Sequence, residues 1–124
     1  MPGLGFKPWP CYGAVMTEVH PLDRLFATIA ARKQAADPSA SYTAKLLSEG
    51  VEKCAGKFGE EAVEAALAAV SGNKAHLAAE SADVLYHLLV LWADWGVAPA
   101  QVWRLLEARS ARSGVAEKKS RPPA

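Results

Sequence analysis

The sequence is poor in cysteine. Its two thiols, Cys11 and Cys54, form no Cys-x-x-Cys pair in a chain of 124 residues. A dense disulfide framework of the kind found in small secreted domains is therefore excluded, and free thiols in a reducing compartment are expected. The first residues, "MPGLGFKPWPCYG", contain one Lys, several breakers and no long apolar run, so they do not form a secretory signal. These absences predict a cytoplasmic protein.

The chain also lacks a long hydrophobic run and an excess of charge. Its longest apolar stretch, residues 84–92, is interrupted by His87 and is far shorter than the about 20 residues that a membrane-spanning helix needs. Fourteen Lys and Arg oppose thirteen Asp and Glu, which leaves a net charge of +1. Such a balance gives no field that would hold nucleic acid or a membrane surface. We expect neither partner, and any electrostatic function must be local.

No stretch combines alternating hydropathy with an excess of β-branched residues, so strands are not expected. Apolar residues instead recur at three- and four-residue spacing, which is typical of helices. Asn73 is a suitable N-cap for one of them, and Gly96 is a suitable stop. The predicted helices cover residues 21–35, about 51–70, about 74–95 and 98–111, with a short helix or turn at 42–50. This pattern predicts an all-α fold of four to five helices in an antiparallel bundle.

The helical region forms one domain with a segment on either side. Residues 1–20 are rich in Gly and Pro and are predicted to form a flexible arm, in which Met16 is an alternative start. Residues 21–112 form the helical domain. Residues 113–124 form a basic tail without apolar periodicity.

An acidic stripe lies on the helix predicted at 51–70. "GKFGEEAVEAA" places Glu60, Glu61 and Glu64 together on one turn of this helix, although like charges at this spacing repel by a few tenths of a kcal/mol per pair. At 100° per residue this stripe has apolar residues on both flanks, which is unlike a broad solvated face.

The next helix carries a second polar stripe. It is apolar nearly all round, which predicts a buried helix, and its main polar residues are Glu80, Asp83 and His87 at i, i+3 and i+7. A carboxylate on a buried helix is unfavourable unless it is paired or coordinates a metal. The short "SGNK" connection predicts antiparallel packing of the two helices, so that the stripes face each other.

Four carboxylates, those of Glu61, Glu64, Glu80 and Asp83, would then share one pocket. Clusters of carboxylate oxygens suit hard cations, and above all Mg²⁺, which often shares its coordination with substrate phosphates. A single Glu-rich turn is more often a solvated face. The second acidic pair on an apolar helix favours a Mg²⁺ site.

Other residues have a structural and a functional interpretation. His87 is either a hydrogen-bonded core histidine, which is the interpretation we favour, or a residue that contacts the carboxylate ligands without binding the metal itself. Trp92, Trp95 and Trp103 are interpreted as core or dimer contacts and not as a stacking platform. The basic tail, with Lys118, Lys119 and Arg121, is either disordered or a phosphate clamp, and composition alone favours disorder.

Three motifs in order, "SYTAKLLSEGVEKCAGKFGEEAVEAA", "ESADVLYHLLVLWADWG" and "RSGVAEKKSR", resemble the phosphoribosyl-ATP pyrophosphohydrolases of histidine biosynthesis. These enzymes belong to the all-α NTP pyrophosphohydrolase superfamily. The resemblance covers about residues 22–121. The acidic pairs indicate only the superfamily, whereas the "SYT", "YH" and tail elements narrow it to this branch.

The resemblance implies hydrolysis of phosphoribosyl-ATP to phosphoribosyl-AMP and pyrophosphate, the second step of histidine biosynthesis, with Mg²⁺ and in a homodimer or higher oligomer. It implies that the four carboxylates of the pocket are metal ligands. It implies that Glu60 is the catalytic carboxylate, which holds a second metal or orients water. It also assigns phosphate contacts to Lys57, Lys118 and Arg121, which reverses the interpretation of the tail as merely disordered.

Two other functions remain open. One is a house-cleaning pyrophosphatase that acts on non-standard or deoxynucleotides with the same metal chemistry. The other is a non-catalytic helical dimerisation module. An oligomer is expected in any case, because the helix at 77–92 is apolar on more sides than four helices can cover.

Overall fold

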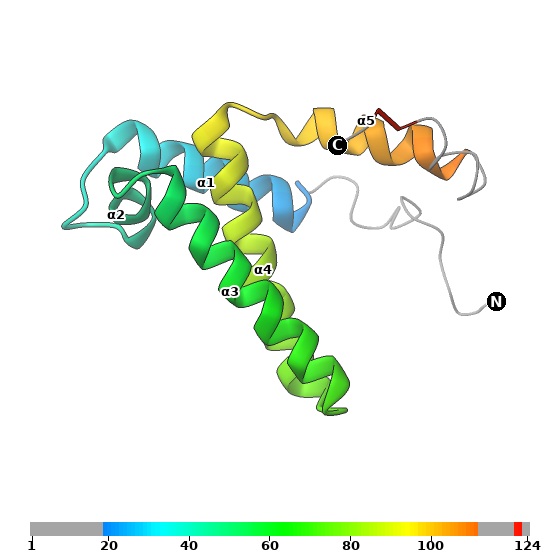
Figure 1. Cartoon of the computed structure of the whole chain (residues 1–124). Helices are drawn as coiled ribbons and strands as arrows, with labels where there is room; N and C mark the ends of the chain where they lie inside the picture. The colour runs from blue at the N-terminus through cyan, green and yellow to red at the C-terminus, as the bar shows by residue number, and fades with distance from the viewer. Residues whose placement is uncertain (1–18, 112–120, 123–124) are drawn as a thin grey trace.

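The computed structural model describes residues 19–111 and 121–122, and its helices account for most of this part of the chain. It contains no strand among these residues, so the predicted all-α fold is confirmed. The predicted arm and tail fall mostly outside them. The described residues form five helices, which follow one another in order (Figure 1). They are α1 Pro21–Ala35, α2 Tyr42–Ser48, α3 Val51–Val70, α4 Lys74–Trp95 and α5 Pro99–Ser110.

The ends of α4 show why local sequence determines these boundaries. The Asn73 side chain accepts the backbone N–H of His76 at 2.9 Å, which satisfies one of the unpaired donors at the helix start. The helix ends at Gly96, whose φ of 71° lies in the left-handed region that residues with a Cβ rarely adopt. Both the predicted cap and the predicted stop are confirmed.

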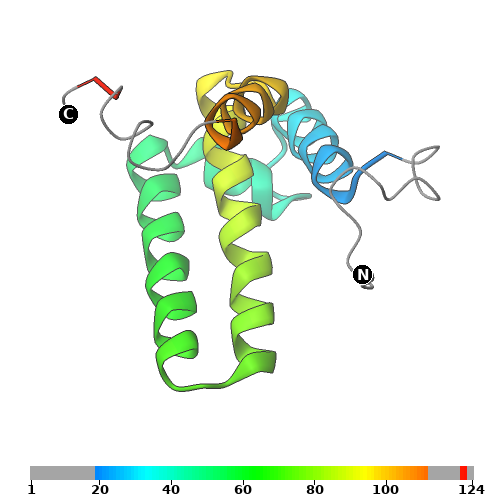
Figure 2. The ribbon, with the colours of Figure 1, turned by 90° about the vertical axis from the view of Figure 1, so that its right-hand side faces the viewer.

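Helices α3 and α4 form a long antiparallel hairpin, as predicted (Figure 2). The turn between them, at Ser71–Asn73, is closed by a hydrogen bond from the Asn73 N–H to the Ala68 carbonyl at 3.2 Å. Helices α1 and α2 lie at the opposite end of the hairpin from this turn (Figure 2). The hairpin therefore has one end packed against other helices and one end, the turn end, that projects from them.

The core lies where α1, α2, α3 and α4 meet. Its buried residues come from all four helices: Ile29, Leu46, Cys54, Leu89, Val90 and Ala93. The thiol of Cys54 donates to the Leu46 carbonyl at 3.3 Å, which joins α3 to α2 inside this core. Burial of this cluster fixes the half of the hairpin farther from the turn relative to α1 and α2.

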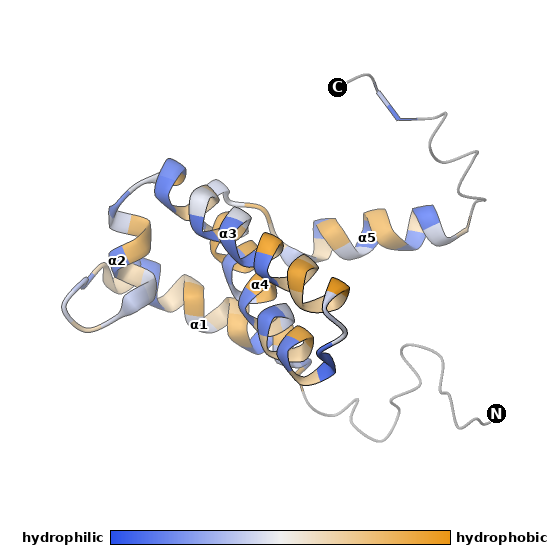
Figure 3. Ribbon diagram, turned by 60° about the horizontal axis from the view of Figure 1, so that its bottom comes forward, coloured by the Kyte–Doolittle hydropathy of each residue, from blue (hydrophilic) through white to orange (hydrophobic). Residues whose placement is uncertain are grey.

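The predicted burial of α4 is found in only one half of the helix, which agrees with the expectation that four helices cannot cover it. Its buried residues, from His87 to Ala93, lie in the C-terminal half. Leu85 is 41% exposed, and on α3 Val63, Leu67 and Val70 are also exposed. The reason is that no other described helix covers the turn end of the hairpin (Figure 3).

Helix α5 also departs from a compact bundle. It extends away from the other helices (Figure 1), and its Leu105 and Leu106 are both more than half exposed. One contact with α4 is an edge-to-face pair of Trp92 and Trp103, with ring centroids 5.8 Å apart. Trp92 packs on the core as expected, whereas Trp95 is 72% exposed. In the part of the chain that the structure describes, no helix is both long and apolar enough to cross a membrane.

Candidate metal centre

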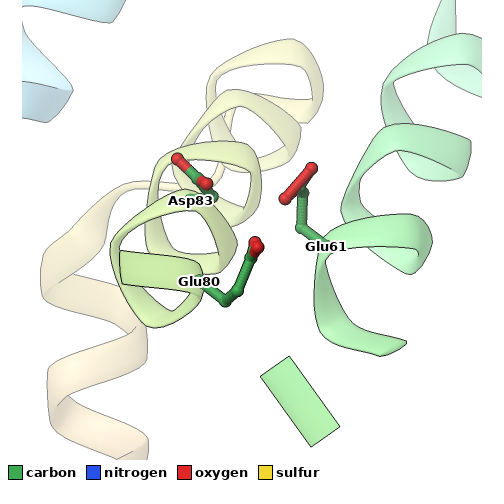
Figure 4. A group of neighbouring side chains, drawn as sticks. All are labelled: Glu61, Glu80 and Asp83. Atoms are coloured by element: carbon green, nitrogen blue, oxygen red, sulfur yellow. The ribbon is translucent and has the colours of Figure 1, made fainter. Parts of the chain in front are cut away.

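Three carboxylates meet between the two helices of the hairpin. Glu61 reaches from α3 toward Glu80 and Asp83 on α4 (Figure 4). One oxygen from each of the three residues lies within 4.8 Å of the others. Glu61 and Glu80 are half-buried and Asp83 is exposed, so the group is open to solvent on one side. We call these three residues the carboxylate trio.

The electrostatics of the carboxylate trio are unfavourable without a cation. Partial burial and the neighbouring carboxyl groups of Glu80 and Asp83 raise the pKa of Glu61, against a smaller opposing effect of Lys57. A proton or a cation is therefore what this arrangement favours.

Glu80 has one oxygen with a partner and one without. Its Oε2 lies 3.1 Å from Nε2 of His76. Its Oε1 is buried and has no hydrogen-bond partner among the described residues. A buried carboxylate oxygen without a donor is unfavourable, and a divalent cation would satisfy it. With three oxygen donors at this spacing, the residues present fit Mg²⁺, which prefers oxygen ligands.

Two further predicted acidic residues lie outside the carboxylate trio. Glu64 is exposed on α3, one turn beyond Glu61, and is not part of the group that the structure brings together. Glu60 is exposed as well and lies 3.7 Å from the Lys57 ammonium. Glu60, Glu61 and Glu64 line a shallow surface hollow with Gly59 and Val63, so both outer carboxylates border the site.

The three residues predicted to bind phosphate differ in where the structure places them. Lys57 lies on α3 four residues before Glu61, and its charge lowers the pKa values of both Glu61 and His87. Lys118 lies outside the described residues. Arg121 lies at the surface in the short described stretch at 121–122.

His87 is buried, as a core histidine would be, with 6% of its surface exposed. Burial and the charge of Lys57 lower its pKa, against opposing effects of Asp83 and Glu60, so the ring is neutral near pH 7. Its Nδ1, however, is buried without a hydrogen-bond partner among the described residues. His87 is therefore buried, as the favoured interpretation of a core histidine predicts, but no described residue forms the expected hydrogen bond with its Nδ1.

The "SYT" motif has a structural role in this fold. The Ser41 hydroxyl caps α2 by accepting the Ala44 N–H at 3.1 Å. The Thr43 and Tyr86 hydroxyl groups are hydrogen-bonded, which ties α2 to α4 one turn from Asp83. The Tyr42 ring stacks on Tyr86 with a centroid separation of 6.4 Å. Together these contacts fix the part of α4 that follows the carboxylate trio.

One contact of the site was missed by reasoning from the sequence. His76 was not singled out, although it precedes Glu80 by four residues and follows the Asn73 cap by three. Side chains four residues apart meet on a helix. That spacing was the available signal.

Comparison with known proteins identifies the family to which the chain belongs. Residues 22–110 match the model of the family described as phosphoribosyl-ATP pyrophosphohydrolase. The chain is 60% identical over 100 residues to the phosphoribosyl-ATP pyrophosphatase of Azospirillum brasilense, covering 81% of this chain and 89% of the relative. With the proteins of the same name from Paramagnetospirillum magneticum and Dinoroseobacter shibae, identity is 59% and 62% over 100 residues. These alignments cover 81% of this chain and 91% and 97% of the two relatives. The chain therefore belongs to the phosphoribosyl-ATP pyrophosphohydrolase family.

Proposed function

We infer that this chain hydrolyses phosphoribosyl-ATP to phosphoribosyl-AMP and pyrophosphate, the second step of histidine biosynthesis. The observation that carries this conclusion is the identity of about 60% with relatives named for this activity, over nearly their whole length. The carboxylate trio supports it, because cleavage of a phosphoric anhydride needs a site that binds both a cation and phosphate oxygens.

The carboxylate trio holds Mg²⁺ in this proposal. Glu61, Glu80 and Asp83 supply oxygen ligands from two helices whose relative position is fixed by the hairpin. Glu64 is a further ligand that acts from the adjacent hollow. When bound, Mg²⁺ polarises the phosphate groups, lowers the pKa of a bound water and neutralises charge on the leaving group.

The reaction joins the oxygen of a water molecule to the α-phosphorus while the bond from this phosphorus to the α–β bridging oxygen breaks. Pyrophosphate leaves with the electron pair of that bond. Glu60 orients the attacking water and accepts its proton, a role suited to an exposed carboxylate at the edge of the site. Lys57 lies 3.7 Å from Glu60, so it can move from this surface ion pair to a phosphate oxygen of the substrate.

Lys118 and Arg121 contact the phosphate groups of the substrate, as the resemblance implies. An Arg side chain suits this role because its planar fork matches two phosphate oxygens, and a Lys supplies a mobile point charge. In the complex with substrate, the carboxylate trio would bind the metal ion, and Lys118 and Arg121 would bind the phosphate groups.

The protein is a homodimer or a higher homo-oligomer in which a second copy covers the turn end of the hairpin. Val63, Leu67 and Val70 recur on α3 at i, i+4 and i+7 and are 58%, 59% and 86% exposed. Such a contiguous apolar stripe is typical of a surface that binds a partner. It flanks Glu60 and Glu64, so a second copy would also shield the proposed site from bulk water.

Turnover of phosphoribosyl-ATP, ATP and dUTP, each with Mg²⁺, tests the function. We expect phosphoribosyl-ATP to be consumed with one pyrophosphate released per molecule and the other two nucleotides to react far more slowly. A preference for dUTP or ATP would support a house-cleaning pyrophosphatase. Absence of turnover with all three would support a non-catalytic helical module.

A further inference from the structure

The first turn of α4 directs an imidazole onto one member of the carboxylate trio. The Asn73 cap accepts the His76 N–H at 2.9 Å, which fixes the start of the helix and hence the place of His76 in its first turn. Glu80 follows four residues later, on the same face. Nε2 of His76 lies 3.1 Å from Oε2 of Glu80.

This contact determines which atoms of the two side chains are engaged. A carboxylate accepts hydrogen bonds, so Nε2 of His76 carries a proton in this contact. The His76 side chain is 49% exposed, whereas that of Glu80 is 14% exposed. His76 therefore contacts the mostly buried Glu80 carboxylate from the side that faces solvent. Oε1 of Glu80, to which no described residue donates a hydrogen bond, is left available as a ligand.

We propose that His76 is a positioning residue for the metal centre, which orients Glu80 for cation binding by donating its Nε2–H to Oε2. This inference rests on the proposed binding of Mg²⁺ by the carboxylate trio. His76 is not itself a ligand, because Mg²⁺ prefers oxygen and Nε2 is engaged by Glu80. Partners that hydrogen-bond to metal ligands typically change metal affinity by about 10–100-fold, and a half-exposed ring places His76 at the lower end.

Titration of the full chain with Mn²⁺ at pH 8, with the unbound ion measured by electron paramagnetic resonance, tests the proposal. We expect the Kd for Mn²⁺ to rise about tenfold in His76→Ala. In His76→Gln it should return close to the wild-type value, because the amide N–H can replace the imidazole donor. Lys74→Ala, which shortens another exposed side chain of the same turn, is the control and should change Kd by less than about twofold.

A second readout is independent of the metal. Nitrogen-15 resonances of the histidine rings in the metal-free protein should identify the Nε2–H tautomer for His76. An Nδ1–H tautomer would overturn the proposal, as would an unchanged Kd in His76→Ala. A wild-type chain that binds no Mn²⁺ would instead contradict the proposed metal centre itself, so the two failures are distinguishable.

Discussion

Glu61 is the residue at which the electrostatics of the metal centre can be measured most easily. Its raised pKa has two main causes: partial burial and the neighbouring carboxyl groups of Glu80 and Asp83. The effect on stability follows from the sign of this shift. A carboxyl group with a higher pKa in the folded than in the unfolded state makes folding less favourable as pH rises above the unfolded value.

We therefore expect Glu61→Gln to be more stable relative to the wild type at pH 7 than at pH 4, when both are compared without metal. The penalty is small below the ordinary pKa of 4.5 and is complete above the folded pKa. Urea unfolding in EDTA at both pH values measures it, with the exposed Glu52→Gln as control. An equal difference at the two pH values would rule out this electrostatic account.

Cys54 gives a second prediction at the scale of one residue. Its side chain is fully buried, and burial raises the pKa of the thiol, with smaller contributions from Asp94 and Glu49. Because the thiolate is the reactive form, we expect alkylation of Cys54 at pH 8 to be at least about 100-fold slower in the folded protein than in urea. The measurement uses a Cys11→Ser background. Similar rates in both states would mean that the core opens readily.

At the scale of single elements, replacing glycine by alanine should change protein stability in opposite directions at a helix end and inside a helix. Gly96→Ala should destabilise the protein by about 1 kcal/mol, because the φ of 71° at this position strains a residue with a Cβ. Gly56→Ala should stabilise it by about 0.5–1 kcal/mol, since Gly56 lies inside α3. In both cases the added Cβ has open space around it. Thermal unfolding measures both shifts, and shifts of the same sign would contradict this explanation.

The helices could be predicted from the sequence because each boundary has its own local signal. Asn73 and Gly96 mark α4, and the apolar spacing between them is helical over the whole segment. Which face of α3 meets α4 is less well determined. Glu61 and Glu64 differ by about 60° around the helix axis, and the packing of the hairpin brings only Glu61 to the carboxylate trio. That outcome depends on how two helices settle against each other, which a single helical pattern does not contain.

The sequence also could not distinguish two ways of covering an apolar helix. The apolar residues of α4 predict a helix that four helices cannot cover, and the core covers only the half that contains His87 to Ala93. The periodicity of apolar residues predicts that a surface is buried, but it does not indicate whether this chain or another copy buries it. The contact of His76 with Glu80 was missed for a related reason, because one imidazole in a first turn is not distinctive by itself.

At the scale of the whole molecule, the exposed turn end of the hairpin makes the oligomer a testable consequence. Leu67→Glu places a charge in the middle of the apolar stripe of α3, so we expect it to shift the protein toward monomer while its helix content is retained. Light scattering at micromolar concentration measures the mass. Leu105→Glu on α5 is the control and should keep the oligomer. A monomeric wild-type protein would contradict the proposed assembly.

The central claim is that the carboxylate trio carries the Mg²⁺-dependent hydrolysis of phosphoribosyl-ATP. The most direct measurement is kcat/KM for this substrate in Asp83→Asn, which keeps the shape of the side chain and removes its charge, beside Glu52→Gln as a matched control. We predict a fall of at least about 100-fold in Asp83→Asn with an unchanged circular dichroism spectrum, and no change beyond about twofold in the control. Near-normal turnover in well-folded Asp83→Asn would contradict the assignment of the metal centre.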